Sequence, residues 1–314
     1  MFSYSEGLDK YLSYRRKKIM SKNAKEIERI EILSGKFCSD IIATELTLSI
    51  VSSVKRCINE IYERPKSTIT FISNLRFLFE TCITVRLLVA EESYKYKLRY
   101  SIYQQQINKS KSLTEYAQKD LSRLDSIQKE EESLYGNENE IDDDSFQNKV
   151  SEIDKLYDSL DEEISIFLDM AEFNGAGYHK THIHSFLKSH QKREDEIRNE
   201  WDEIKKSLLK NEEANRFFDF KGQTSRVEKE LKDNRNWKDK AAFVGLEEIY
   251  KFIYDYSSSL IHSMSYSILI PNQLELPEIN MVIGLSTRIT SDILKNLCIF
   301  GKIPNMLVLR IDDE

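Results

Sequence analysis

A stretch near the C-terminus, YDYSSSLIHSMSYS at residues 254–267, combines residue types that could do chemistry. Tyr254, Ser258 and His262 recur every four residues, so a helix would place a phenol, a hydroxyl and an imidazole on one face. A histidine exchanges a proton near neutral pH, and hydroxyl groups beside it can donate or accept hydrogen bonds. This face is the first candidate site.

A second polar pair lies in the otherwise apolar stretch NLRFLFETC. Arg76 and Glu80 are four residues apart and would share a helix face. Burying an arginine and a glutamate costs free energy unless each finds a partner. We therefore expect the polar row of residues 254–262 to meet this pair in the core.

The composition indicates which elements position these residues. The chain has 314 residues, of which 40% are hydrophobic, and only 9 Gly and 4 Pro punctuate it. Few helix breakers and a large apolar fraction indicate long helices around a sizeable core. We predict an all-α fold with a helical bundle core. The formal net charge of -7 argues against a general affinity for nucleic acid but leaves a local basic patch open.

Apolar periodicity places the helices of this core. It runs at helical spacing through 24–64, where Pro65 ends it, and a helix from about Ser67 is apolar on nearly all sides, as is typical of a central buried helix. A helical run follows from Trp237 to Pro271, and a last helix covers 279–302. The tail, 305–314, alternates as a short strand would.

The middle of the chain is highly charged and carries narrow apolar seams. The segment 93–135 is joined by YGNENEIDDDS to a coiled-coil seam in 150–171, which predicts an antiparallel helical hairpin. The seam residues are Val150, Ile153, Tyr157, Leu160, Ile164, Phe167 and Ala171, and a third seam consists of Phe186, His190, Ile197, Trp201, Ile204 and Leu208. We therefore predict a long antiparallel coiled-coil-like arm at 93–213, inserted between two halves of the core at 1–92 and 214–314.

Three motifs of the core, SNLRFLFET, NWKDKAA and VGLEEIYKFIYDYSSSLIHS, resemble an uncharacterised family of bacterial all-helical proteins. That family shows an R-x3-E helix, a tryptophan segment and a closing Y-x3-S-x3-H motif. The charged arm has no counterpart in the resemblance, which supports its being an insertion. The matching positions are Arg76, Glu80, Trp237, Tyr254, Ser258 and His262.

This family is similar, more loosely, to the HEPN superfamily of helical bundles, which includes metal-independent ribonucleases of bacterial defence and toxin systems. The resemblance implies that His262 moves a proton at the ribose or the leaving oxygen, that Arg76 holds the phosphate charge, and that Glu80 orients either. HEPN nucleases carry an R-x4-6-H motif, and no arginine stands at those positions before His262. Arg76, on another helix of the bundle, would have to take the place of that arginine.

Two functional classes stay open. The first is a HEPN-like effector of a bacterial defence or toxin-type system that acts on RNA or nucleotide-containing partners. Tyr254, Ser258 and Trp237 are the expected binding residues, and Tyr254 and Ser258 could instead donate hydrogen bonds in a ligand pocket. The second is a non-catalytic interaction or scaffold protein that self-associates or binds a protein partner through 93–213. In that class the polar groups of the core would only fix the helix register.

Two further features bear on ligands. Four histidines, at positions 179, 182, 184 and 190, could bind zinc, but no recognised ligand spacing is present, and we expect a loop between arm helices there, with no metal and no cofactor. The segments YRRKK at 14–18 and YKYKLRY at 94–100 interleave cations with tyrosines. That composition fits either an RNA-stacking surface or a solvated helix face.

The remaining features concern the cell compartment. The four cysteines are scattered among apolar neighbours without a CxxC pair, which favours buried thiols in a reducing cytosol over disulfides. The N-terminus lacks the apolar core of a signal peptide, and no stretch approaches 18 uncharged apolar residues. We predict a cytoplasmic homo-oligomer that does not span a membrane.

Overall fold

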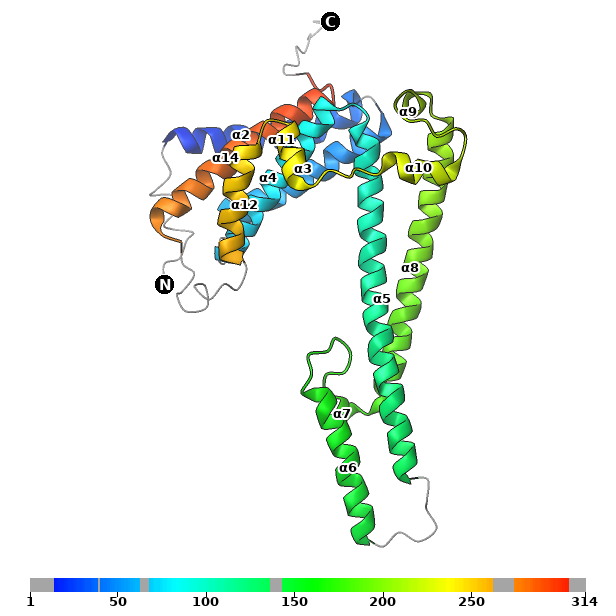
Figure 1. Ribbon diagram of the computed structural model, residues 1–314. Helices are drawn as coiled ribbons and strands as arrows, with labels where there is room; N and C mark the ends of the chain where they lie inside the picture. The colour runs from blue at the N-terminus through cyan, green and yellow to red at the C-terminus, as the bar shows by residue number, and fades with distance from the viewer. Residues whose placement is uncertain (1–13, 39, 63–67, 136–142, 262–273, 305–314) are drawn as a thin grey trace, which may run out of the picture. The chain divides into compact units, whose positions relative to one another are not determined.

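The computed structural model describes residues 14–38, 40–62, 68–135, 143–261 and 274–304 (Figure 1). Within these ranges the regular structure is helical throughout and no strand occurs, so the all-α prediction is confirmed. The strand predicted at 305–314 lies outside the described residues.

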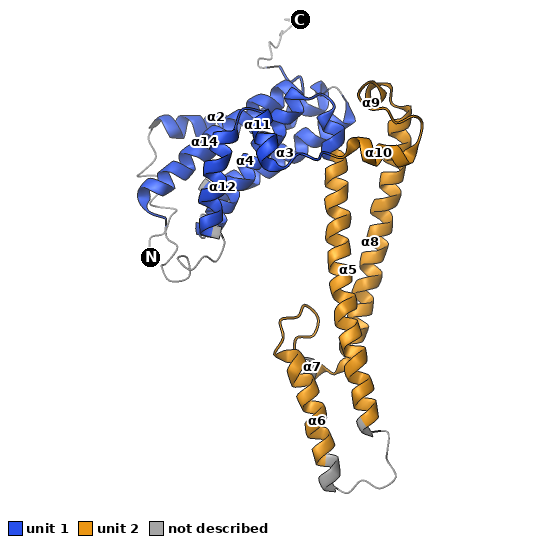
Figure 2. Cartoon of the chain, in the orientation of Figure 1, with its two compact units in different colours: residues 1–98, 233–314 blue, residues 99–232 orange. Residues whose placement is uncertain are grey.

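The chain divides into two compact units (Figure 2). Residues 1–98 and 233–314 form the first unit, and residues 99–232 form the second. The second unit differs from the expected insertion at 93–213 at both of its ends. At the first end, Tyr94 and Leu98 belong to the apolar core of the first unit. At the other end, the short helices at 212–217 and 224–231 pack against the long helix at 176–210 and so belong to the second unit.

The first unit is built around one helix, α4 (Thr68–Ala90). Its buried side chains, among them Ile72, Leu75 and Leu78, face neighbours on several sides. The structure therefore agrees with the prediction of a central helix in this segment. The helices of this unit that pack on α4 are α3 (Ile41–Tyr62), α11 (Trp237–Phe243), α12 (Glu247–Ile261) and α14 (Leu276–Phe300), while α2 (Tyr14–Phe37) packs on α3 and α14.

The prediction of one continuous helix over 24–64 is wrong, because two helices occupy this region. α2 ends at Phe37 and α3 begins at Ile41. The Asp40 carboxylate accepts a hydrogen bond from the Ala43 amide at 2.7 Å, which is the bond of a helix N-cap. Apolar periodicity continues on both sides of the break, so the periodic pattern alone could not reveal it.

The helical run expected from Trp237 to Pro271 is also interrupted. Gly245 has a φ of 71°, a conformation that glycine adopts without strain, and it separates α11 from α12. The Leu246 amide donates to the Ala241 carbonyl at 2.8 Å and the Gly245 amide to the Ala242 carbonyl at 3.1 Å. This pair of bonds is the Schellman motif that ends helices.

The second unit holds two long antiparallel helices, α5 (Tyr94–Tyr135, which starts in the first unit) and α8 (Ala176–Lys210), together with a shorter helix, α6 (Asp143–Asp161) (Figure 1). Tyr103 stacks on Trp201 with 4.7 Å between ring centroids, whereas Lys180 contacts Asp125 at 2.5 Å. Since residues later in α5 meet residues earlier in α8, the two helices run in opposite directions. Three short helices complete the unit: α7 (Ala171–Asn174), α9 (Glu212–Phe217) and α10 (Thr224–Leu231).

The heptad seam expected in 150–171 does not continue as one helix. α6 ends at Asp161, and Ile164, assigned to the seam, is 98% exposed. The chain instead forms a loop whose shape depends on Ser165. The Ser165 hydroxyl donates to Asp120 at 2.8 Å and accepts from the Phe167 amide at 3.2 Å, and Asp120 is fully buried. The first half of the seam, from Ile153 to Leu160, does pack in the apolar core of the second unit.

All four cysteines are free thiols; Cys57, Cys82 and Cys298 are buried and Cys38 is half-buried. Within the described part of the chain, no helix combines the length and apolar character needed to cross a bilayer.

The position of α4 predicts a sharp difference between adjacent residues. Leu78 has no exposed surface, whereas its neighbour Phe77 is 39% exposed. We expect Leu78→Ala to lower the free energy of unfolding by about 2–5 kcal/mol, because it leaves a cavity in the core. Phe77→Ala, measured beside it by urea denaturation, should cost clearly less. Equal losses would contradict the assignment of α4 as the centre of the unit.

Candidate functional site

The structure brings together three of the residues expected at the site. On α4, the Arg76 Nε donates to the Glu80 Oε1 at 3.0 Å. On α12, the ring of Tyr254 lies beneath the same guanidinium, with 4.9 Å from the Arg76 Cζ to the ring centroid. One arginine therefore joins the polar rows of α4 and α12 through an ion pair and a cation–π contact.

An aromatic row runs from this contact along α12 and then crosses back to α4. The ring centroids of Tyr254 and Tyr250 are 5.6 Å apart, and those of Tyr250 and Phe79 are 6.5 Å apart. Burial raises the pKa of Tyr250, and the neighbouring Tyr254 and Glu80 raise it further. This phenol therefore stays protonated near neutral pH, where it can donate a hydrogen bond but cannot act as a base.

The Arg76 cluster lies at the edge of the core and not inside it, which corrects the expected buried seam. Tyr254 is 41% exposed, and the side chains of Arg76 and Glu80 are 30% and 26% exposed. α4 is buried on most sides, but its Arg76 side is only partly covered by α12. Water therefore screens the ion pair, whose contribution to stability is about 0–1 kcal/mol.

The other three expected site residues lie elsewhere. Ser258 is half-buried one turn beyond Tyr254 on α12. His262 lies outside the described residues, so its proposed role as acid or base stays a prediction. Trp237 is the first residue of α11, where it packs against the apolar core beneath the Lys240 Nζ at 5.2 Å from its ring centroid.

Trp237 thereby joins a cluster of alternating charges around Arg235. Arg235 contacts Asp233 at 2.8 Å and Glu91 at 2.9 Å, and Lys240 contacts Asp233 at 3.4 Å. Burial alone would raise the pKa of Asp233, but hydrogen bonds from Arg235 and the charge of Lys240 outweigh it and lower the pKa. The acids and bases of this cluster are paired with one another, which is the arrangement of a structural network.

Sequence reasoning missed a polar contact between α4 and α14 in the first unit. Arg86 on α4 forms two hydrogen bonds with Asp292 on α14, at 2.7 and 3.0 Å, and the Cys82 thiol donates to the same carboxylate at 3.1 Å. Burial would raise the pKa of Asp292, but the bonds from Arg86 and Cys82 lower it. Burial raises the pKa of the Cys82 thiol, so this cysteine is no nucleophile. Lone charges in TVRLLV and TSDILK were the available signal.

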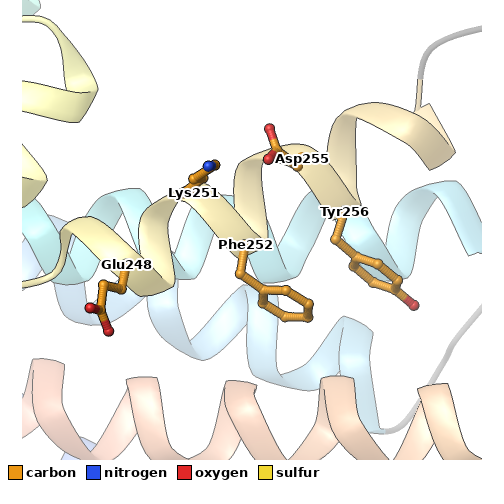
Figure 3. Close-up of a pocket in the computed structure, with 5 residues that line it drawn as sticks. All are labelled: Glu248, Lys251, Phe252, Asp255 and Tyr256. Atoms are coloured by element: carbon orange, nitrogen blue, oxygen red, sulfur yellow. The ribbon is translucent and has the colours of Figure 1, made fainter.

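A shallow groove of about 450 Å³ lies along α12 (Figure 3). Its lining consists of Glu248, Lys251, Phe252, Asp255 and Tyr256, all from this one helix. The rings of Phe252 and Tyr256 stack at 5.8 Å, and the Tyr256 hydroxyl donates to Glu278 of α14 at 3.2 Å. The groove is thus one side of a single helix. Its lining carries both acidic and basic side chains, and its phenol, Tyr256, already donates a hydrogen bond to Glu278.

The four histidines lie on helix α8, not on the loop expected there. His179 is buried, and its Nδ1 is 2.6 Å from the Phe167 carbonyl oxygen. His190 packs on Phe186 with 4.1 Å between ring centroids. Among the residues that the structure describes, no three His, Cys, Asp or Glu side chains gather as metal ligands would. His179 and His190 are packing groups of the second unit.

A group of exposed large hydrophobic side chains, here named the arm patch, occurs where α6 leads through a loop and α7 into α8. Sequence reasoning missed it, because Ile164 was placed in a buried seam. Its members are large hydrophobic residues with high exposed fractions: Ile164 (98%), Phe173 (83%), Tyr178 (60%), Ile166 (56%) and Met170 (54%). Phe167 and Leu168, which stand between Ile166 and Met170 in sequence, are buried and pack in the apolar core of the second unit.

No protein-family model matches the chain, and no curated protein or solved structure matches it significantly. The likeness to HEPN proteins therefore stays an expectation from sequence motifs.

The contact of Arg76 with Tyr254 can be tested by a double-mutant cycle. We expect Arg76→Ala, Tyr254→Ala and the double variant to show a coupling free energy of about 0.5–1 kcal/mol, the usual range for a part-exposed cation–π pair. Urea denaturation of the four proteins measures it. Additive losses would show that α12 does not pack on Arg76 in this way.

The contact of Arg86 with Asp292 predicts a pH dependence. Because the folded state lowers the pKa of Asp292, the stabilisation is complete above the ordinary aspartate pKa of about 3.9 and is lost as the pH falls through the lower folded value. We expect Asp292→Asn to cost about 1–2 kcal/mol at neutral pH and to flatten the fall in stability below pH of about 4.

The control for that experiment is Asp255→Asn, which changes an exposed carboxylate on α12. It should leave both the neutral stability and its slope with pH nearly unchanged. An Asp292→Asn variant with the slope of the unmodified protein would contradict the assignment.

Proposed function

We propose that this chain is a non-catalytic helical interaction protein that binds a protein partner at the arm patch. The observation that carries the proposal is the exposure of five large hydrophobic residues within fifteen positions, from Ile164 to Tyr178. Burying such surface is favourable by roughly 25 cal/mol per Å². Clustered exposed hydrophobic residues are accordingly typical of interaction sites in soluble proteins.

The backbone under the arm patch is held in place by specific hydrogen bonds, which supports a binding role. Ser165 accepts from two loop amides and donates to Asp120, and the Tyr116 hydroxyl donates to the Ile164 carbonyl at 3.2 Å. The loop backbone from Ile164 to Leu168, which carries two of the exposed side chains, is therefore held in place. A surface ordered before binding loses less conformational entropy when a partner arrives.

The ribonuclease hypothesis stays a prediction beside this proposal. Its proton-transfer residue, His262, lies outside the described residues, and its phosphate-binding residue, Arg76, already pairs with Glu80. Binding a phosphate at Arg76 would require that pair to open. The arm patch requires no such rearrangement, and this difference favours the interaction function.

Site-specific photo-crosslinking in the source cells tests the proposal. A photoreactive phenylalanine analogue at Phe173 should yield a defined adduct with another protein. The matched control carries the analogue at Ile32, which is 68% exposed but belongs to the first unit. The double variant Ile164→Ser with Tyr178→Ser, combined with the analogue at 173, should lose the adduct. Equal adducts at 173 and 32, or none at 173, would contradict the proposal.

A further inference from the structure

The segment that carries the arm patch is strongly one-sided in charge. Between Lys155 and Lys180 the sequence contains six acidic residues and no lysine or arginine. The acids for which the structure gives side-chain exposure all lie on the surface: Asp158, Asp161, Glu162, Glu163 and Asp169. Hydrophobic anchors and acidic groups therefore share one short segment.

We infer that the partner of the arm patch is a basic amphipathic helix, with apolar residues on one face and lysine or arginine at its edges. The inference rests on the proposed function and names the chemical class of the partner. The exposed rings and branched side chains would contact the apolar face, and the acidic residues would attract the flanking cations.

The local charges favour this occupant over others. Glu163 pairs with Arg123 at 2.5 Å, and the sequence between Lys155 and Lys180 contributes acids without a lysine or arginine of its own. At physiological salt, charges act over a Debye length of about 8 Å, so the acids act on groups close to them. A second copy would bring the same acidic segment against this one, and anionic membranes and RNA would also be repelled.

The secondary structure selects the mode of docking. Among the described residues no strand occurs, so the arm patch offers no sheet edge that an extended peptide could join. The partner must then be held by side chains. An amphipathic helix suits this, because residues at spacings of three and four present several anchors on one face.

The experiment uses the full-length protein and fluorescence anisotropy of synthetic peptides. The probe is a labelled helix with leucine on one face and lysine on the other. One comparator replaces every lysine by glutamate, and a second has the lysine–leucine composition in scrambled order. We expect the lysine helix to bind at least about tenfold more tightly than either comparator, and its affinity to fall as salt is raised.

Matched variants locate the binding. Ile164→Ser with Phe173→Ser should remove binding of the lysine helix, and Glu162→Gln with Asp169→Asn should weaken it by about tenfold. The control, Glu130→Gln with Glu132→Gln on α5, removes the same charge from exposed positions outside the patch. It should leave the affinity unchanged. Circular dichroism verifies that each variant keeps its helices.

The outcomes separate this inference from the proposed function. Crosslinking at Phe173 without discrimination between the lysine and glutamate helices would overturn the basic-helix partner while leaving the interaction function in place. Binding of an RNA oligonucleotide or of anionic vesicles, or self-association, lost in the Ile164→Ser/Phe173→Ser variant would also overturn it. If neither crosslinks nor peptide binding occur, both proposals fall.

Discussion

Helix α4 carries apolar side chains on so many sides that it is stable only when other helices cover most of its surface. Those helices come from both ends of the chain: α3 precedes α4, whereas α11, α12 and α14 follow it at a distance of more than a hundred residues. The intervening residues must therefore leave the first unit and return to it. The network of Glu91, Lys97, Asp233 and Arg235 ties together the point of departure and the point of return.

The same constraint explains where the first unit keeps its polar groups. Apolar surfaces alone allow helices to slide, and directional bonds remove that freedom. Arg86 and Asp292 fix α4 against α14. Asn23 of α2 donates to the Thr287 carbonyl at 3.2 Å and accepts from Ser291 at 2.9 Å, which fixes α2 against α14. These described polar contacts thus orient the helices of the first unit.

The helices themselves could be predicted from the sequence, because amphipathic periodicity is local. The breaks could not be predicted from periodicity, since apolar spacing continues through Asp40 and past Asp161. Gly245 was a readable signal for a helix end, but its meaning depends on a positive φ that one sequence does not display. The arm patch was hidden for a different reason. Whether Ile164 is buried depends on a bond between Ser165 and Asp120, which are 45 residues apart in sequence.

The geometry around Arg76 follows from sequence spacing in one respect and from tertiary packing in another. The four-residue spacing indicated that Arg76 and Glu80 share a helix face, and the structure pairs them at 3.0 Å. The spacing could not tell that this pair lies at the edge of the core, because exposure depends on how far α12 covers α4.

The distribution of charge connects the fold with the proposed role. The segment from Leu156 to His179 accounts for six of the seven net negative charges of the chain, so the remainder is nearly neutral. A nearly neutral body exerts little long-range force, while a concentrated acidic segment attracts cationic partners to one place. Hydrophobic anchors there would set how long a partner stays, and the acids would set which partner arrives and how fast. Selectivity for a basic helix would then need no enclosed pocket, because hydrophobic contact and electrostatic attraction both arise from the same short segment.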